Sequence, residues 1–134
     1  MSFYEELVNK DLKYIWHPFT QMKDHETDEP LIIDKGKGVY VWDLKGNKYI
    51  DGVSSWWVNT LGHSNDRLNN ALKAQVDKIE HVLLAGFSHQ PAIELAERLI
   101  NLMPQELTKV FYSDNGSTAV EVALKMAYQY WCHK

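Results

Sequence analysis

Hydrophobic and polar positions change their spacing several times along the chain, and each spacing predicts a different element. Apolar and aromatic residues recur at roughly helical intervals over 2–14, which predicts a short helix. The segment 15–30 holds two prolines around a polar middle, which is typical of an ordered loop. Three short runs follow that fit a β-meander, with strands at 31–33, 38–43 and 48–51 and a Gly-Asn turn before the last.

Helical spacing dominates the second half of the chain. Residues 52–64 fit neither period, because they combine small residues, two adjacent tryptophans and a Gly-His pair. Asn65 or Asp66 then begins a helix that we expect to reach about residue 81. Pro91 stands at the first position of a further helix, which is predicted to end near Pro104.

The last segment reads as strand, turn and helix. Residues 108–112 are predicted to form a short buried strand, 113–117 a turn, and a helix runs from about Thr118 to the end. Thr118 and Glu121 have the spacing of a capping box. A small antiparallel part followed by helices and such a strand predicts an α/β protein, cut at the opening of a mainly parallel sheet.

The turn before this helix is the strongest candidate for chemistry. The first N–H groups of a helix lack intrahelical partners, and the helix dipole places partial positive charge there. Gly116 permits close approach of a ligand to the backbone, and Ser117 and Thr118 add hydroxyl groups, so the segment has the features of a phosphate cradle. An ordinary capped helix explains the same residues, and neither GxxxxGK[ST] nor GxGxxG is present.

Two aromatic segments are further candidates. Trp56 and Trp57 follow two serines, and we expect one ring to be buried while the other lines a cavity, because adjacent side chains point in different directions. Core packing of both rings is the alternative. Pro18 restrains His17 and holds Phe19 in a rigid turn, which either lines a site or only tethers the N-terminal segment.

Composition narrows the classes of function. The 134 residues carry 14 Lys and Arg against 18 Asp and Glu, a net charge of −4. A mildly acidic chain without a basic cluster argues against nucleic-acid binding. The single cysteine, Cys132, excludes an internal disulfide and favours the cytoplasm. No signal peptide, membrane-spanning run or histidine pattern typical of a metal site is visible.

Three runs of the sequence carry a resemblance to a known family: WHPFTQM, DGVSSWW and FYSDNGSTAVEVALKMAYQYW. Together they resemble the N-terminal third of the class III aminotransferases, and in particular the branch that serves biotin biosynthesis. The resemblance implies a fold-type-I enzyme that uses pyridoxal 5'-phosphate and works as a homodimer. It also implies that residues 1–60 belong to the small domain and that 61–134 open the large cofactor-binding domain.

The resemblance further implies an activity and site residues. The reaction moves an amino group onto 8-amino-7-oxononanoate and gives 7,8-diaminononanoate. Gly116 and Ser117 are expected to hold the cofactor phosphate, and Trp56 to line the substrate pocket. Phe19 stands where the family commonly has a tyrosine, so the amino donor is either S-adenosylmethionine or lysine. Asn115 receives no role.

The family's catalytic groups have no counterpart in this sequence. The lysine that links the cofactor, the aspartate on its ring nitrogen and the substrate-binding arginine are expected beyond residue 134. The helical pattern also reaches Lys134 without a stop signal, so we expect an N-terminal section of a longer protein that is inactive alone. The alternatives are another class III aminotransferase, acting on an ω-amino acid, and an inactive truncated remnant.

Overall fold

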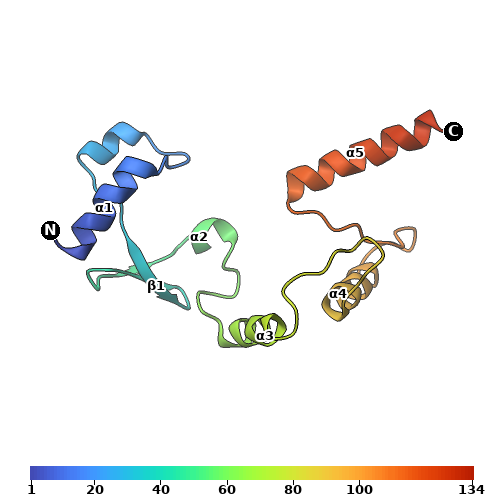
Figure 1. The fold of residues 1–134 in the computed structure, drawn as a ribbon, viewed down its shortest axis with the longest axis horizontal. Helices are drawn as coiled ribbons and strands as arrows, with labels where there is room; N and C mark the ends of the chain where they lie inside the picture. Colours follow the sequence, from blue (N-terminus) through green and yellow to red (C-terminus); the bar gives the residue numbers. More distant parts are fainter. The chain divides into compact units, whose positions relative to one another are not determined.

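Residues 1–134 are described by a computed structural model, in which one small sheet is accompanied by helices (Figure 1). The contacts divide the chain into two units, Met1–Glu80 and His81–Lys134. The first unit contains α1 (Phe3–Tyr14), η1 (Met22–Glu26), β1 (Ile33–Lys37), β2 (Tyr40–Asp43), β3 (Lys48–Ile50), α2 (Ser54–Trp57) and α3 (Asp66–Val76). The second contains α4 (Gln90–Ile100) and α5 (Gly116–Cys132).

The N-terminal helix α1 is confirmed, and its start is closed by a capping box. The Ser2 hydroxyl accepts a hydrogen bond from the Glu5 amide at 3.2 Å, and the Glu5 carboxylate accepts one from the Ser2 amide at 2.7 Å. These two bonds satisfy donors that a helix start otherwise leaves open. The loop that follows contains one short 3₁₀ helix, η1, which the sequence pattern did not indicate.

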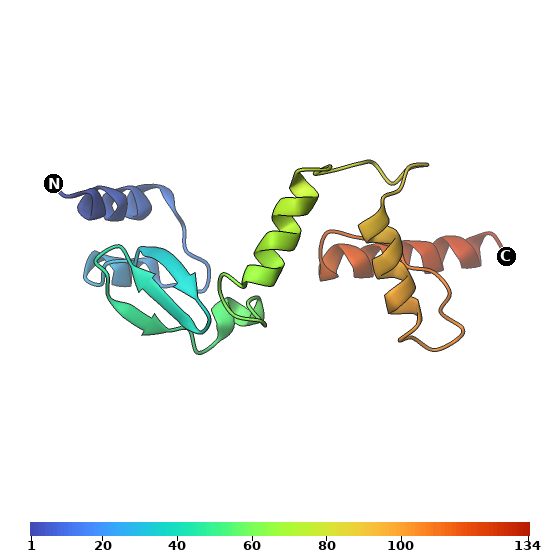
Figure 2. The same cartoon turned by 90° about the horizontal axis from the view of Figure 1, so that it is seen from below.

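Strands β1, β2 and β3 form one antiparallel sheet in that order, which confirms the β-meander (Figure 2). The predicted bounds of the first strand, 31–33, were wrong, because β1 begins at Ile33 and runs to Lys37. Its polar residues pair with β2 in the antiparallel sheet, where Lys37 lies opposite Tyr40. An exposed edge strand carries few apolar residues, so hydrophobic patterning placed this strand too early.

The turn between β2 and β3 is organised by a buried carboxylate. Asp43 is 3% exposed and accepts hydrogen bonds from the amide and side chain of Asn47 and from the Tyr49 hydroxyl, at 2.8 to 2.9 Å. Burial raises the pKa of Asp43, but these hydrogen bonds outweigh burial and leave the pKa below its ordinary value. Of the predicted Gly-Asn pair, only Gly46 takes a positive φ, of 86°.

Helices α3 and α4 are present with shorter bounds than predicted. Asn65 caps α3 by accepting from the amides of Arg67 and Leu68, at 3.1 and 3.3 Å. This helix ends at Val76 rather than near residue 81, and α4 ends at Ile100 rather than near Pro104. None of the helices is both long enough and apolar enough to cross a membrane.

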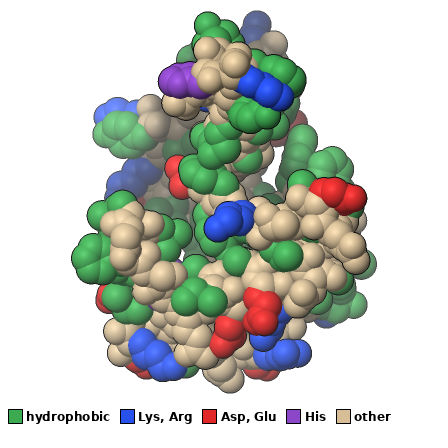
Figure 3. All heavy atoms as spheres, turned by 90° about the vertical axis from the view of Figure 1, so that its right-hand side faces the viewer, with side chains coloured by type: hydrophobic (Ala, Val, Ile, Leu, Met, Phe, Trp, Pro, Cys, Tyr) green, Lys and Arg blue, Asp and Glu red, His purple; other side chains and the backbone are tan.

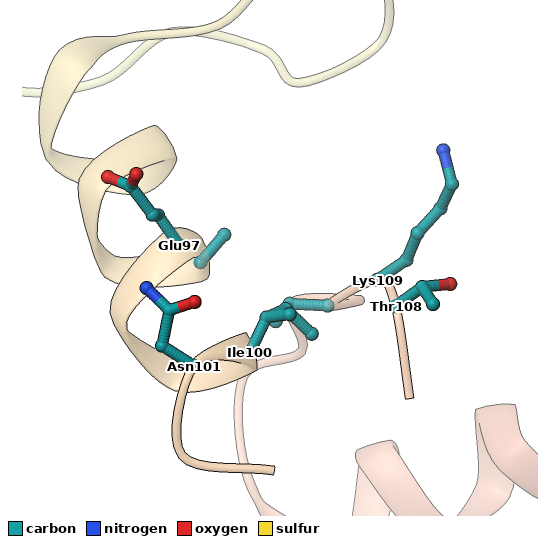
Figure 4. Close-up of a pocket in the computed structure, with 7 residues that line it drawn as sticks. Glu97, Ile100, Asn101, Thr108 and Lys109 are labelled. Carbon is teal, nitrogen blue, oxygen red and sulfur yellow. The ribbon is translucent and has the colours of Figure 1, made fainter. Parts of the chain in front are cut away.

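The predicted strand at 108–112 was wrong for this chain, because the segment pairs with no other strand. A strand needs a neighbour to receive its backbone hydrogen bonds, and β1–β3 pair only with one another. The segment instead borders a groove beside α4, and Figure 4 shows Ile100 between that helix and the stretch that carries Thr108 and Lys109. The Tyr112 hydroxyl donates to the carbonyl of Ala92 at 2.6 Å.

Very little apolar surface is buried within the chain. Val8, at 4% exposure, is the only buried apolar side chain. On α5, Leu124 and Tyr128 are 66% and 75% exposed, and hydrophobic side chains are spread over the face drawn in Figure 3. No helix packs extensively on another element, so most amphipathic faces remain uncovered.

We expect residues 1–134, produced alone, to bind a hydrophobic dye and to unfold without a sharp transition, because the apolar faces lack partners. Calorimetry and dye fluorescence measure both properties. Leu124→Glu should lower dye binding, whereas Val8→Glu should raise it, because Leu124 is exposed and Val8 is buried. A sharp cooperative transition of a monomer that binds no dye would contradict the expectation.

Candidate functional site

The two predicted substrate contacts of the first unit lie against each other. The rings of Phe19 and Trp56 are stacked, with centroids 5.3 Å apart and planes 18° from parallel. They are nonetheless 92% and 63% exposed, so each offers aromatic surface to a ligand. Trp57 lies 5.9 Å from Trp56 and is 73% exposed. The expectation that one tryptophan is buried was therefore wrong.

Both tryptophans lie in a turn with an unusual backbone. Residues 54–57 of α2 all have positive φ, between 47° and 66°, so this turn is left-handed. Phe19 also has a positive φ, of 53°. Such a conformation costs roughly 1–2 kcal/mol per residue for side chains other than glycine. Neither helical nor strand spacing describes a left-handed turn, which is why the pattern at 52–64 fitted neither period.

The carboxylate of Asp51 holds the left-handed turn in place. It accepts hydrogen bonds from the Ser55 amide at 2.9 Å and from the Ser55 hydroxyl at 2.7 Å. The same carboxylate lies 2.7 Å from Nε2 of His63. The side chains of Asp51 and His63 are only 11% and 17% exposed, so this group of contacts is largely shielded from water.

These hydrogen bonds stabilise the charged form of Asp51. The amide of Ser55, then its hydroxyl, then His63 lower the pKa of Asp51 from 3.8 to about 2. An ionised carboxylate has no proton to donate, so Nε2 of His63 carries the proton of their hydrogen bond. Because folding favours the charged form, the stabilisation is complete above about pH 4 and is lost as the pH falls towards 2.

His63 is fixed to the sheet by its own backbone. Its amide and carbonyl exchange hydrogen bonds with Gly38, at 2.8 and 2.9 Å, in the turn between β1 and β2. Its ring lies so close to Gly36 that a Cβ on that residue would approach His63 to 2.7 Å. Glycine at position 36 is therefore required by the close approach of the imidazole.

A second carboxylate and histidine lie at the base of the Phe19 turn. Asp11, in α1, is 8% exposed, and its two oxygens lie 2.8 and 3.1 Å from Nε2 of His17. The amide of His17 donates to the sulfur of Met22 at 3.4 Å, and its ring lies 5.0 Å from that of His25. His17 is thereby tied to α1 and to η1, immediately before Pro18 and Phe19.

In the second unit, the start of α5 differs from the predicted cap. The helix begins at Gly116 and is capped by Asn115, whose side chain accepts from the Thr118 amide at 3.0 Å. The Thr118 hydroxyl in turn accepts from the Asn115 amide at 3.2 Å. The predicted capping box of Thr118 with Glu121 was wrong, because Glu121 pairs with Lys125 instead. Asn115, which was expected to have no role, is the cap.

The cap leaves the predicted phosphate contacts available. The amides of Gly116 and Ser117 and the hydroxyl of Ser117 make no hydrogen bond within the chain. The backbone of Gly116 is helical, and nothing lies within 4 Å of where a Cβ would stand. Neither packing nor conformation within the chain therefore requires glycine here.

A pocket of about 320 Å³ adjoins this helix start. Ser113 and Asp114, just before the cap, line it together with Tyr112 and with the segment that leads into α4. The histidines of this lining form no ligand pattern in the sequence, so the pocket has no local signal there. The lining residues are His81, Val82, Leu83, Leu84, His89, Tyr112, Ser113 and Asp114. Gly116 and Ser117 lie in a different unit from Phe19 and Trp56.

Comparison with known proteins places this geometry in a family. Residues 21–134 match the class III aminotransferase family. This chain belongs to that family. It is 55% identical over 98% of its length to the adenosylmethionine-8-amino-7-oxononanoate aminotransferase of Staphylococcus aureus, and 52% identical over 92% to that of Aquifex aeolicus. It spans 29% and 27% of the lengths of these two curated relatives.

Solved structures agree with this assignment. The adenosylmethionine-8-amino-7-oxononanoate aminotransferase of Methanocaldococcus jannaschii is 50% identical and superposes with a TM-score of 0.88, over 96% of this chain and 30% of that one. The omega transaminase of Pseudomonas jessenii in complex with PMP is 40% identical, with a TM-score of 0.81 over 91% of this chain and 27% of that one. The chain therefore has the fold of the N-terminal part of class III transaminases.

We expect the carboxyl group of Asp51 to titrate with a midpoint near pH 2, because three hydrogen bonds stabilise its charged form. Carbon NMR of aspartate-labelled protein measures this midpoint, and the Asp51→Asn variant assigns the signal. Ser55→Ala removes one donor and should raise the midpoint towards 3.8, whereas Asp66→Asn, at a carboxylate 84% exposed, should leave it unchanged. A midpoint near 3.8 in the unaltered protein would contradict the hydrogen-bonded geometry.

Proposed function

We propose that this chain supplies the N-terminal part of a pyridoxal-phosphate-dependent aminotransferase of biotin biosynthesis that works in the cytoplasm. The enzyme transfers an amino group to 8-amino-7-oxononanoate and gives 7,8-diaminononanoate. The observation that supports this most directly is the 55% identity, over 98% of the chain, to the Staphylococcus aureus protein named for that substrate. Since the chain spans 29% of that relative, the remaining parts of the site belong to the rest of the enzyme.

Gly116 and Ser117 hold the cofactor phosphate in this proposal. Two adjacent amides and one hydroxyl without partners lie in the first turn of the 17-residue helix α5, where the dipole favours an anion. The position that a Cβ of residue 116 would take is open, so no atom of this chain obstructs a phosphate on that side of Gly116. Pyridoxal phosphate, when bound, supplies an electron sink and carries the amino group between the two half-reactions.

Phe19 and Trp56 bind the substrate. Their exposed, stacked rings provide apolar contact for a hydrocarbon chain such as that of 8-amino-7-oxononanoate. Neither side chain carries an acid or base, so their part is to orient the substrate and exclude water from it. The covalent cofactor lysine comes from the enzyme beyond this chain, and none of the residues 1–134 is assigned a catalytic role.

The enzyme works as a homodimer. The uncovered apolar side chains of the two units support this, because faces of this kind are buried by other parts of an enzyme or by a second subunit. A second candidate function is transamination of ω-amino acids, which the 40% identity to the Pseudomonas jessenii transaminase favours. A chain of 134 residues produced alone is an inactive remnant in either case.

The full-length protein that contains this chain should form 7,8-diaminononanoate from 8-amino-7-oxononanoate, detected by mass spectrometry. S-adenosylmethionine and lysine are supplied in separate reactions, because the absence of a hydroxyl on Phe19 leaves the donor open. Residues 1–134 alone should give no product with either donor. Turnover of ω-amino acids without any of this product would favour the second candidate function.

Gly116→Asp in the full-length protein should weaken cofactor binding about tenfold, because a carboxylate beside the phosphate repels it where the site favours one anion. Folding should not suffer, since an acidic residue in the first turn of a helix is favourable. The cofactor dissociation constant and the melting temperature of the apoenzyme measure the two effects.

Gly116→Asn is the matched control, because it has nearly the same size without the charge. Its loss of cofactor affinity should be clearly smaller than that of Gly116→Asp. Equal affinities for the cofactor in the aspartate variant and the unaltered protein would remove Gly116 from the phosphate site.

A further inference from the structure

The stack of Phe19 on Trp56 needs support from outside itself. The two residues are 92% and 63% exposed within residues 1–134, so no other part of this chain buries them. An aromatic pair gains about 0.5–1.5 kcal/mol, whereas each left-handed residue beneath it costs roughly 1–2 kcal/mol. Since Phe19 and the whole turn 54–57 are left-handed, the ring contact alone is too weak to impose the backbone geometry.

On the Trp56 side, a continuous series of contacts leads from the sheet to the ring. His63 is paired with Gly38 through both backbone groups, and its ring reaches Asp51 at 2.7 Å. Asp51 holds both the amide and the hydroxyl of Ser55, the residue immediately before Trp56. The left-handed turn is thereby tied to the strands at the point where the aromatic side chain leaves it.

On the Phe19 side, a second series of contacts has the same chemistry. Asp11, buried in α1, holds His17 through Nε2, and His17 lies two residues before Phe19. Pro18, between them, has a restricted φ and transmits the position of His17 to Phe19. The Thr20 hydroxyl donates to the carbonyl of Pro18 at 3.0 Å and closes the turn.

We propose that the pairs Asp51–His63 and Asp11–His17 are positioning residues, which set the spacing of the Phe19–Trp56 stack and thereby the affinity for substrate. Neither pair touches the substrate. The inference rests on the proposed function of Phe19 and Trp56 as substrate contacts. Each pair acts on one side of the stack, so loss of either should separate the rings.

A spectroscopic test in the full-length enzyme is independent of any substrate. The difference in near-ultraviolet circular dichroism between the parent and its Trp56→Phe variant isolates the signal of the stacked tryptophan. Asp51→Asn and Asp11→Asn should each lose more than about half of this difference signal, whereas Asp66→Asn, at an exposed carboxylate of the same unit, should keep it. Ser55→Ala removes the hydroxyl that donates to Asp51, and Gly36→Ala places a Cβ against the ring of His63. Both variants therefore test the contacts of Asp51 while its carboxylate is retained.

Kinetics then connect the stack to binding. Asp51→Asn and Asp11→Asn should raise KM for 8-amino-7-oxononanoate about two- to tenfold with little change in kcat. In a Phe19→Leu background, where the stack is absent, the same substitutions should have no further effect on KM. If the two aspartates had a purely structural role, their substitution would lower the stability of the enzyme equally with Phe19 and with Leu at position 19. The effect on KM would then not depend on Phe19.

The two readouts separate failure of this inference from failure of the proposed function. An unchanged tryptophan signal in Asp51→Asn, Asp11→Asn and Ser55→Ala overturns the inference, whatever the enzyme acts on. Loss of the signal without any turnover of 8-amino-7-oxononanoate supports the positioning role and rejects the proposed substrate. Additive effects on KM in the Phe19→Leu background also overturn the inference.

Discussion

Carboxylates that must find hydrogen-bond donors organise residues 1–80. Asp11 and Asp43 are 8% and 3% exposed, and the side chain of Asp51 is 11% exposed, whereas Val8 is the only buried apolar side chain. An ionised carboxylate shielded from water is costly unless donors surround it. Each of the three takes donors from residues 4 to 12 positions further along the chain, so the chain is bent around each carboxylate in turn.

These polar contacts determine the positions of the two segments that carry Phe19 and Trp56. Asp11 fixes the segment that carries Phe19, and Asp51 fixes the segment that carries Trp56. The rings themselves stay exposed, which suits residues proposed to meet a substrate. Shielded polar contacts behind exposed aromatic rings allow a binding surface to be rigid without being buried, because the hydrogen bonds and not the rings determine the backbone.

The start of α5 shows the same division of roles between adjacent residues. Asn115 and Thr118 satisfy each other and stabilise the helix, whereas Gly116 and Ser117, between them, keep their donors unpaired. A helix can therefore be well capped and still leave donors free for the phosphate in the proposed function. The uncovered apolar side chains of α5 fit the proposal that the chain is part of a larger enzyme, since the family relatives are more than three times its length.

Much of the local structure follows from the sequence by itself. The meander, the helices α1, α3, α4 and α5 and the turn before α5 were predictable, because periodicity, proline and capping residues act over a few residues. The residues proposed to contact cofactor and substrate came from the family resemblance together with those patterns. The contacts that these residues make within the chain, and the exposed fractions of their side chains, were not predictable.

Tertiary structure decided the rest. The left-handed turn at 54–57 depends on Asp51 and His63, which lie outside it, so no local pattern reveals it. The extent of β1 depends on its pairing with β2, and 108–112 fails to become a strand because no partner lies beside it. Strand pairing and carboxylate–histidine contacts join residues that are separated in the chain, and a side chain's chemistry does not specify which distant group will meet it.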